Sequence, residues 1–355
     1  MGIIGIATGD GVGKEIIDVV IPIIEKVAEK YKVDIGFRDL IIGGASIDRY
    51  GTSLTEYTIS SAKNCDAVIV GAVGGDKNSK WYEKPINDRP ERGLLRLRKQ
   101  MDLYINLRPV HFYKELADIA CQKINTDFEV LLIRETASGV YFGEKNTYFD
   151  NGIINASDSL NYSEKEIERT AKRSIEMAKS KNSSLLCVDM AHILETSRLW
   201  RMVLSALSYD TEVFIKYMHA DKCAEKLIKS PSEFSIILTD NLLGDMLFGV
   251  LAGIQGSAAM IPSAYLGDTN FGIYESCGGP AIDIEGKDIA NPLGNILSAG
   301  LMFEHSFNNK AASKCIKKAV SKVLAEGYRT MDMMKGEGIP VGTSKMGDLI
   351  LKNIE

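Results

Sequence analysis

The sequence predicts an α/β protein with two lobes. Short apolar runs typical of buried strands recur along the chain, segments with helical spacing of apolar residues separate them, and the chain has 355 residues. Alternating strand and helix patterns are typical of α/β folds. A single core stops growing at about 250 to 300 residues. We therefore expect two lobes.

The chain opens with a strand, a turn and a helix. The apolar run IIGIAT and the glycine-rich turn GDGVG precede a segment at about 14–30, where isoleucine and valine recur at helical spacing. The run DAVIVGAVGG at 66–75 predicts a strand that is buried on both faces. Similar strands are expected at 130–133, 185–188 and 235–238.

Two further segments have local signatures. Residues 163–179 begin with Ser-x-x-Glu and have helical periodicity, which predicts a helix with a capping box. Residues 141–158 are rich in Asn, Asp and Gly between aromatic residues, which predicts an irregular hairpin that could form an arm.

Composition excludes several classes of partner. Hydrophobic residues make up 45% and charged residues 25% of a chain with net charge −5, and its basic residues are spread out. We therefore expect no nucleic-acid partner and no membrane patch. No apolar stretch reaches about eighteen residues and the start lacks a basic signal region, which predicts a cytoplasmic protein. Six cysteines without a CxxC pair favour buried reduced thiols over a zinc site or disulfides.

Two glycine-rich loops are candidate binding loops. The loop at 9–13 could hold a phosphate at a helix N-terminus, although its spacing fits neither the dinucleotide fingerprint nor the P-loop, and a tight structural turn is the alternative. The loop at 275–283, followed by IANP, carries an acidic residue of the kind that binds a ribose diol.

Four arginines could bind carboxylates. Arg96, Arg98 and Arg108 lie in GLLRLRKQMDLYINLRPV, and Arg134 follows the apolar run VLLI, so their guanidinium groups are expected to end short elements. Converging guanidinium groups would suit a diacid. Surface salt bridges are the alternative for each of them.

Ten strings, in order along the chain, resemble those of the β-decarboxylating dehydrogenases, the isocitrate/isopropylmalate dehydrogenase family, and particularly its 3-isopropylmalate branch. They are GDGVGKE, GGASIDRYG, AVGG, RPERGLLRLRKQMDLYINLRPV, IRETASGVYFGE, SRLWR, NLLGDML, GSAAMIPSAYLG, IANP and EGYRT…VGTSKMGD. The resemblance runs from the first strand to the C-terminus.

The resemblance implies the family's two-domain fold, in which helices flank a central mixed sheet. Residues 1–99 and 252–355 would form a discontinuous cofactor-binding domain. Residues 100–251 would form the substrate and dimerisation domain, with an arm at about 141–158. A homodimer is implied.

The resemblance also implies a substrate site. Arg98, Arg108 and Arg134 would hold the two carboxylates of a malate-type diacid. Leu94 would lie against its alkyl group, where isocitrate enzymes have serine. Tyr141 would be the acid that protonates the enol product. An alkylmalate-type 2-hydroxy diacid is therefore the expected substrate.

NAD is the cofactor that the resemblance implies. Asp283 would bind the adenosine ribose and repel a 2′-phosphate, and Asn291 would lie near the adenine. The other cofactor contacts would be Glu91, Glu275 and Gly279. The family's adenine-facing histidine is Gly278 here, so we expect loose NAD binding or another ligand in that cleft.

The family's catalytic base is replaced. It is a lysine within Val-Asp-Lys-Ala-Asn, and here that string ends in Met190, Ala191 and His192. A Met thioether has no titratable proton. His192 and His219 are candidates to replace the missing base or a metal ligand, because histidine titrates near neutral pH and binds metals. Packed or solvated histidines are the alternative.

One metal ligand is also replaced. The positions that match the family's three aspartates are Asp221, Asp245 and Gly249. Two carboxylates with substrate oxygens and water can still hold Mg²⁺ or Mn²⁺, so we expect weakened affinity before loss.

Three functions follow from these residues. The favoured one is a divergent NAD-dependent oxidoreductase that oxidises and decarboxylates an alkylmalate-type diacid. The second is a catalytically impaired binding or regulatory homologue that pairs with an active paralogue. The third is a metal-assisted decarboxylase or isomerase that omits hydride transfer.

Overall fold

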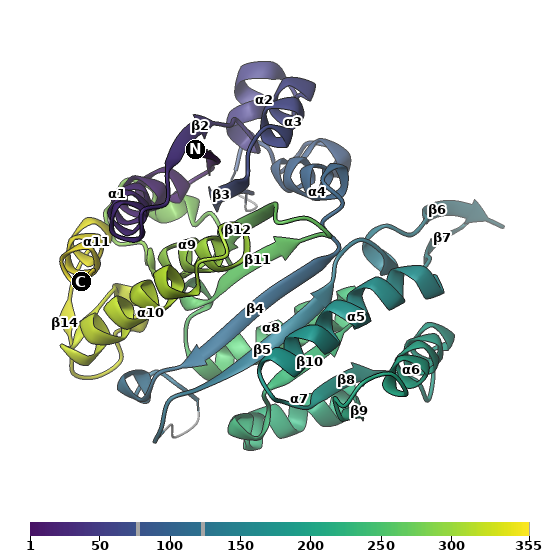
Figure 1. Cartoon of the computed structure of the whole chain (residues 1–355). Coiled ribbons are helices and arrows are strands. Elements are labelled where there is room, and N and C mark those ends of the chain that lie inside the picture. The colour runs from purple at the N-terminus through teal and green to yellow at the C-terminus, as the bar shows by residue number, and fades with distance from the viewer. Residues whose placement is uncertain (76–78, 122–124, 355) are drawn as a thin grey trace. The chain divides into compact units, whose positions relative to one another are not determined.

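The structure, a computed structural model, describes residues 1–75, 79–121 and 125–354 and divides into two compact units. Unit 1 comprises Met1–Leu103, His111–Asp127 and Gln255–Glu355 (Figure 1). Unit 2 comprises Tyr104–Val110 and Phe128–Ile254. Each unit has its own strands and helices, as expected for a two-lobed α/β protein.

The strands of unit 1 form a mixed arrangement in the order β2-β1-β3-β12-β11. Their bounds are β1 Gly2–Gly9, β2 Ile35–Asp39, β3 Ala67–Ala72, β11 Pro262–Leu266 and β12 Gly272–Ser276. All neighbours pair in parallel except β11 and β12, which are antiparallel. β3 is buried along its whole length, which confirms the strand predicted from the apolar run. The two-residue strands β13 Tyr328–Arg329 and β14 Ile339–Pro340 pair separately.

Helices surround these strands, and one of them is central. The helices of unit 1 are α1 Gly13–Tyr31, α2 Gly44–Tyr50, α3 Glu56–Lys63, α4 Pro90–Gln100, α9 Leu293–His305, α10 Lys310–Ala325 and α11 Thr343–Lys352. Every residue of α9 from Leu293 to Phe303 is buried. A helix that is buried all round lies within a core, and α9 contacts β12, β11, α10 and α1 (Figure 1).

Unit 2 has strands in the order β4-β5-β10-β8-β9. They are β4 Ile105–Phe112, β5 Phe128–Glu135, β8 Leu185–Asp189, β9 Ile215–His219 and β10 Ile236–Thr239. The helices are α5 Glu164–Ser180, α6 Glu195–Ser208, α7 Ala220–Lys229 and α8 Asn241–Gln255. The predicted capping box is confirmed, because Ser163 and Glu166 satisfy each other's backbone N–H groups at the start of α5.

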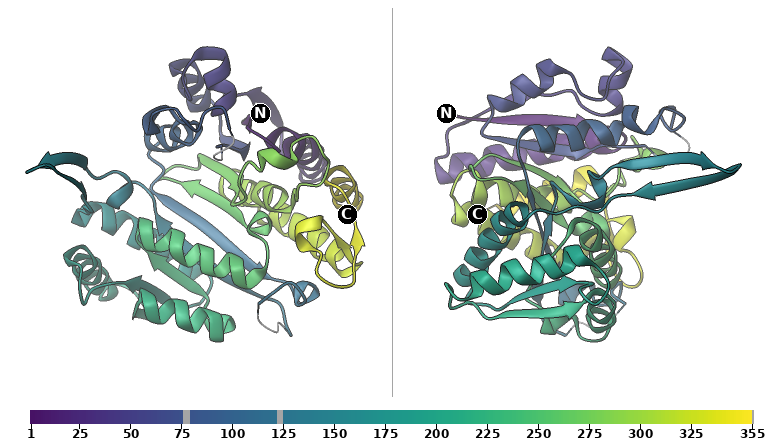
Figure 2. Two further views of the ribbon diagram at one scale, coloured as in Figure 1. Left: turned by 180° about the vertical axis from the view of Figure 1, so that it is seen from behind. Right: turned by 90° about the vertical axis from the view of Figure 1, so that its right-hand side faces the viewer.

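A hairpin of unit 2 extends outward from α5 (Figure 2). β6 Lys145–Asp150 pairs antiparallel with β7 Ile153–Asp158 in unbroken register. Asn151 and Gly152 join them with positive φ angles of 49° and 79°, the conformation of a type I′ turn. The expected hairpin is confirmed, but it is regular, because Asn-Gly is the preferred sequence for this turn.

The α/β class and the mixed sheet are thus confirmed. The cysteines are free, and Cys65, Cys187, Cys223 and Cys315 are buried as expected, whereas Cys121 is exposed. No helix in the described part of the chain is long and apolar enough to span a membrane. The cytoplasmic location stays a prediction.

Candidate active site

Two arginines of unit 2 meet on one carboxylate. Arg108 from β4 and Arg134 from the end of β5 both donate to Oδ1 of Asp245 in α8, Arg108 at 3.1 Å. Both arginine side chains are 8% exposed and that of Asp245 is 33% exposed. Two buried guanidinium groups therefore share one carboxylate. Guanidinium groups that converge in this way suit the recognition of carboxylates.

Asn241, the first residue of α8, holds Arg134 in place. Its Oδ1 accepts from Nε of Arg134 at 3.0 Å and from Nη2 at 2.5 Å, and its Nδ2 donates to the Ser138 carbonyl at 2.9 Å. Asn241 is buried. The sequence prediction did not include Asn241, although it lies in the NLLGDML string.

Tyr141 completes this group of side chains. It lies in the short 3-10 turn η3 Gly139–Tyr141, and its hydroxyl donates to Oδ2 of Asp245 at 2.5 Å. Burial and, next, the Asp245 carboxylate raise the pKa of Tyr141 to about 12. The phenol therefore keeps its proton at neutral pH.

Arg98 and Leu94 lie on α4 in unit 1. Nη2 of Arg98 forms an ion pair with Oε1 of Glu275, and its guanidinium stacks 3.6 Å from the Tyr265 ring centroid. Leu94 is buried in a core cluster that also contains Leu97 and Tyr265.

Arg96 shows the alternative that the sequence left open. Its side chain is half exposed and lies 3.8 Å from Glu56, an ordinary surface ion pair. Of the two alternatives for Arg96, the structure therefore shows the surface salt bridge.

The loop after β8 carries Met190 and His192. Asp189, at the end of β8, accepts from the Ala191 backbone and from Nε and Nη2 of Arg201 at 2.7 and 3.0 Å. The backbone N–H of Met190 donates to Oγ of Ser197 at 3.1 Å, so the start of the loop is tied to α6 by two adjacent residues. The Met190 side chain is partly exposed.

The histidines lie side by side. The ring centroids of His192 and His219 are 4.2 Å apart. Asp221, in the first turn of α7, is exposed and has no hydrogen bond or ion pair to another described residue. No group of three potential metal ligands occurs among the residues that the structure describes.

Gly249 lies on α8 one turn after Asp245. A Cβ atom built there would have no heavy atom within 4 Å. A side chain would therefore find room at this position.

The two glycine-rich loops contact each other in unit 1. The backbone N–H of Val12 donates to the Pro280 carbonyl at 2.9 Å, and a Cβ on Gly11 would lie 2.0 Å from that oxygen. Asp10 accepts backbone N–H groups of Gly44, Ala45 and Gly74 at 3.0 Å each, and burial raises its pKa. This loop therefore has a structural role, and because Gly9, Asp10 and Gly11 also line a cavity, the binding alternative stays a prediction.

A cavity of about 530 Å³ opens beside these loops, with Thr8, Lys14, Asp48, Ser79 and Trp81 among its lining residues. Oγ of Ser79 is buried there without a hydrogen-bond partner among the described residues. Glu91 accepts the backbone N–H of Gly75 at 3.0 Å.

The other expected cofactor contacts are spread over nearby loops of unit 1. Gly279 has open space around it, and Asp283 is exposed in the 3-10 turn η6 Ile282–Ile284. Asn291 binds Asp332 through Nδ2 at 3.0 Å and caps α9 by accepting from the Leu293 N–H at 3.0 Å. Asn291 thus has a structural role.

A profile of the isocitrate/isopropylmalate dehydrogenase family matches residues 3–350. The chain belongs to this family. A 3-isopropylmalate dehydrogenase from Pseudomonas savastanoi pv. phaseolicola is 42% identical, over 98% of this chain and 97% of the relative. An isocitrate dehydrogenase structure from Methylococcus capsulatus has a TM-score of 0.87 at 25% identity, covering 100% of this chain and 99% of that one.

A β-decarboxylating dehydrogenase structure from Thermococcus kodakarensis has a TM-score of 0.80 at 27% identity, covering 100% of this chain and 96% of that one. The chain is therefore a 3-isopropylmalate dehydrogenase-like member of a family of oxidoreductases. Within this family fold, the structure brings together Arg108, Arg134, Tyr141 and Asp245 of the predicted residues. It also pairs Arg98 with Glu275.

Proposed function

We propose that this chain is a divergent NAD-dependent oxidoreductase that oxidises and decarboxylates an alkylmalate-type 2-hydroxy diacid, with 3-isopropylmalate as the first compound to test. The observation that supports it most is the convergence of Arg108, Arg134 and Tyr141 on Asp245. Arginine pairs of this kind suit carboxylates because each guanidinium can donate two parallel hydrogen bonds.

A bound diacid would exchange partners with Asp245. One substrate carboxylate would accept hydrogen bonds from the guanidinium groups of Arg108 and Arg134, which now donate to Asp245. Asn241 would keep Arg134 oriented, because its Oδ1 binds two nitrogens of that guanidinium. Little rearrangement of Arg134 would then accompany binding, which favours affinity.

Tyr141 would act as the proton donor to the enol product. Its pKa of about 12 keeps the phenol protonated, and its hydroxyl points at the carboxylate group around which the substrate would lie. Proton transfer by a positioned side chain typically contributes about 10²- to 10⁴-fold in rate. Met190 cannot accept the hydroxyl proton, so we propose slow turnover.

The carboxylates present fit a divalent cation held in part by substrate and water. Asp221 and Asp245 offer oxygen donors, which Mg²⁺ and Mn²⁺ prefer, and Asp221 is exposed. A bound metal ion would polarise the hydroxyl and carboxylate oxygens of the substrate. Gly249 contributes no ligand, which supports weak affinity.

The cavity of unit 1 fits a polyhydroxylated cofactor such as NAD. Its volume of about 530 Å³ suits a ligand of this size, and the buried hydroxyl of Ser79, which has no hydrogen-bond partner among the described residues, suits a ligand with many hydrogen-bonding groups. Asp283 and Glu285, on the adjoining loop, would disfavour a 2′-phosphate by charge repulsion. NAD, when bound, supplies the hydride acceptor.

A homodimer is part of the proposal. The hairpin exposes Phe149, Ile153 and Ile154, which are 75%, 65% and 65% exposed, and α8 exposes Met246 at 63%. Apolar side chains grouped on a projecting element mark an interaction surface.

The test is a turnover assay. The purified protein, with NAD and Mn²⁺, receives a panel of 2-alkylmalates and NADH is measured. We expect slow NADH formation with at least one alkylmalate and a lower rate for Tyr141→Phe. The absence of NADH above the Tyr141→Phe level for every substrate contradicts the proposal.

A second function is favoured by Met190 and Gly249, which replace a base and a metal ligand of the family. The chain would then be a non-catalytic subunit that binds the diacid and pairs with an active paralogue. It predicts that the diacid raises the melting temperature without turnover. Tight homodimers without any effect on a paralogue's rate would exclude it.

A further inference from the structure

Helix α10 carries an unbalanced group of lysines. Within Lys310–Ala325 there are five of them, namely Lys310, Lys314, Lys317, Lys318 and Lys322, and no acidic residue, although the whole chain has a net charge of −5. Like charges at i, i+4 repel and destabilise a helix. Lysines four residues apart lie on the same side of a helix, so residues that look dispersed in the sequence come together on α10. The expectation that basic residues are spread out was therefore incomplete.

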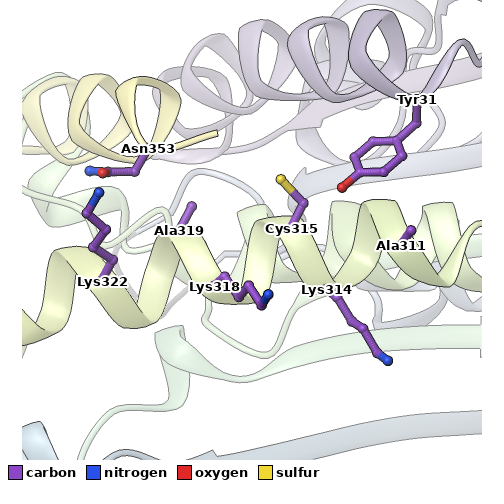
Figure 3. A pocket seen from close by; sticks show the side chains of 8 residues that line it. All are labelled: Tyr31, Ala311, Lys314, Cys315, Lys318, Ala319, Lys322 and Asn353. Carbon is purple, nitrogen blue, oxygen red and sulfur yellow. The ribbon is translucent and has the colours of Figure 1, made fainter. Parts of the chain in front are cut away.

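A cavity lies against this side of α10. It has a volume of about 490 Å³ and includes in its lining Lys314, Lys318 and Lys322 from α10, Tyr31 from α1 and Asn353, which follows α11 (Figure 3). None of the described residues that line it is acidic. The side chains of Lys314 and Lys318 are exposed and form no hydrogen bond or ion pair with another described residue.

The cavity also has neutral donors and a fourth ammonium group close by. Figure 3 shows the Tyr31 hydroxyl turned toward Cys315 and the Lys322 ammonium reaching toward the Asn353 amide. Nζ of Lys30 lies 3.4 Å from Sγ of Cys315, whose thiol is buried beside the cavity. Positive charge thus approaches the cavity from α1 as well as from α10.

We propose that this cavity is a binding site for a compact polyphosphate anion, either inorganic or the polyphosphate group of a nucleotide. Its volume exceeds that needed for a single phosphate and lies within the range of small-molecule sites, about 300 to 1,000 Å³. The cationic lining groups are lysine ammonium groups, which bind phosphate as point charges, and several of them together suit an anion with several negative charges. The concave shape favours a small ligand over a membrane surface.

Calorimetry tests the site directly. Tripolyphosphate, ATP, citrate and vesicles with anionic lipids are titrated into the protein at low ionic strength, where surface charges are least screened. We expect tripolyphosphate to bind with 1:1 stoichiometry and more tightly than citrate. Equal affinity for ATP indicates that the phosphates alone are recognised, and tighter binding of ATP indicates a nucleotide ligand. Binding of vesicles without binding of tripolyphosphate overturns the proposal.

Matched variants assign the binding to this cavity. Lys314→Gln and Lys318→Gln should each weaken tripolyphosphate binding about fivefold, because each removes one positive charge near the ligand. Lys63→Gln, an exposed lysine at the end of α3, should leave the affinity unchanged. The melting temperatures of these three single variants should equal or exceed that of the parent protein. Equal affinity of the parent and the Lys314→Gln Lys318→Gln double variant overturns the proposal.

Thiol labelling provides a second measurement. Cys315 lines the cavity, whereas the exposed Cys121 does not. Alkylation of each thiol is measured by peptide mass spectrometry. Tripolyphosphate should slow the alkylation of Cys315 at least threefold and leave the rate at Cys121 unchanged. Equal slowing at both thiols, or at neither, places the ligand elsewhere and contradicts the assignment.

Discussion

Replacing Met190 by lysine should restore a proton acceptor to the position where the family has its base. The backbone there is held independently of the side chain, because its N–H donates to Ser197 and its carbonyl accepts from the N–H groups of Ile193 and Leu194. The side chain is partly exposed, so a lysine of similar length can keep its ammonium in water. We therefore expect Met190→Lys to fold with the stability of the parent.

The size of the effect depends on the protonation of the new lysine. A positioned general base contributes about 10²- to 10⁴-fold, or roughly 3 to 5 kcal/mol of activation free energy. With an unperturbed pKa of about 10.4, only about one lysine in 2,500 is neutral at pH 7. The nearby Arg201 is paired with Asp189, so this ion pair adds little net charge. The rate of Met190→Lys should therefore rise about tenfold per pH unit until the lysine pKa is reached.

The assay is NADH formation from the best 2-alkylmalate, followed against pH for the parent, Met190→Lys and Met190→Gln. Glutamine has similar length and cannot accept the proton, so it serves as the matched control. The reasoning is refuted if Met190→Lys and Met190→Gln have equal rates, or if the rate of Met190→Lys does not depend on pH.

Three further predictions concern other residues. Gly249→Asp should tighten Mn²⁺ binding, measured by calorimetry, because the new carboxylate has room beside Asp245. The control Gly253→Asp, one turn later and equally open, should leave the Mn²⁺ affinity unchanged. Equal Mn²⁺ affinities of the two variants contradict this role of position 249. Asn241→Ala should lower the free energy of unfolding in urea by about 2 to 4 kcal/mol, because it leaves the buried Arg134 without two hydrogen bonds. The exposed control Asn64→Ala should cost less than about 0.5 kcal/mol, and a similar loss in both variants contradicts the reasoning. Burial raises the pKa of Glu135 from 4.5 to about 7, so the folded protein binds this proton more tightly than the unfolded chain does. The folded protein should therefore lose stability as the pH rises from 4.5 to 7, by at most about 1.4 kcal/mol per pH unit. Urea unfolding of Glu135→Gln should lack this slope, and an identical pH dependence in the parent would refute the shift.

Local features of the fold could be predicted because their causes are local. The capping box at Ser163 needs only residues three apart, and the strand that becomes β3 has the unbroken apolar run of a doubly buried strand. The Asn151-Gly152 turn has an equally local cause, but the prediction treated its surroundings as irregular and missed it.

Partners that are distant in the sequence could not be predicted. Arg134 was predicted to bind a carboxylate, but its contact with Asn241 joins residues 107 positions apart, and the pairing of Arg98 with Glu275 joins residues 177 apart. Periodicity cannot identify such partners, because strand order decides which loops meet. The lysines of α10 were overlooked for a related reason, since their common cavity depends on α1 and on Asn353.

A crystal structure with 3-isopropylmalate and Mn²⁺ tests the central claim most directly. We predict a ligand carboxylate hydrogen-bonded to both Arg108 and Arg134, with Asp245 no longer bound to Arg134 and Asn241 still in place. A structure in which both arginines keep their bonds to Asp245 while the ligand binds elsewhere, or fails to bind at saturating concentration, would contradict it.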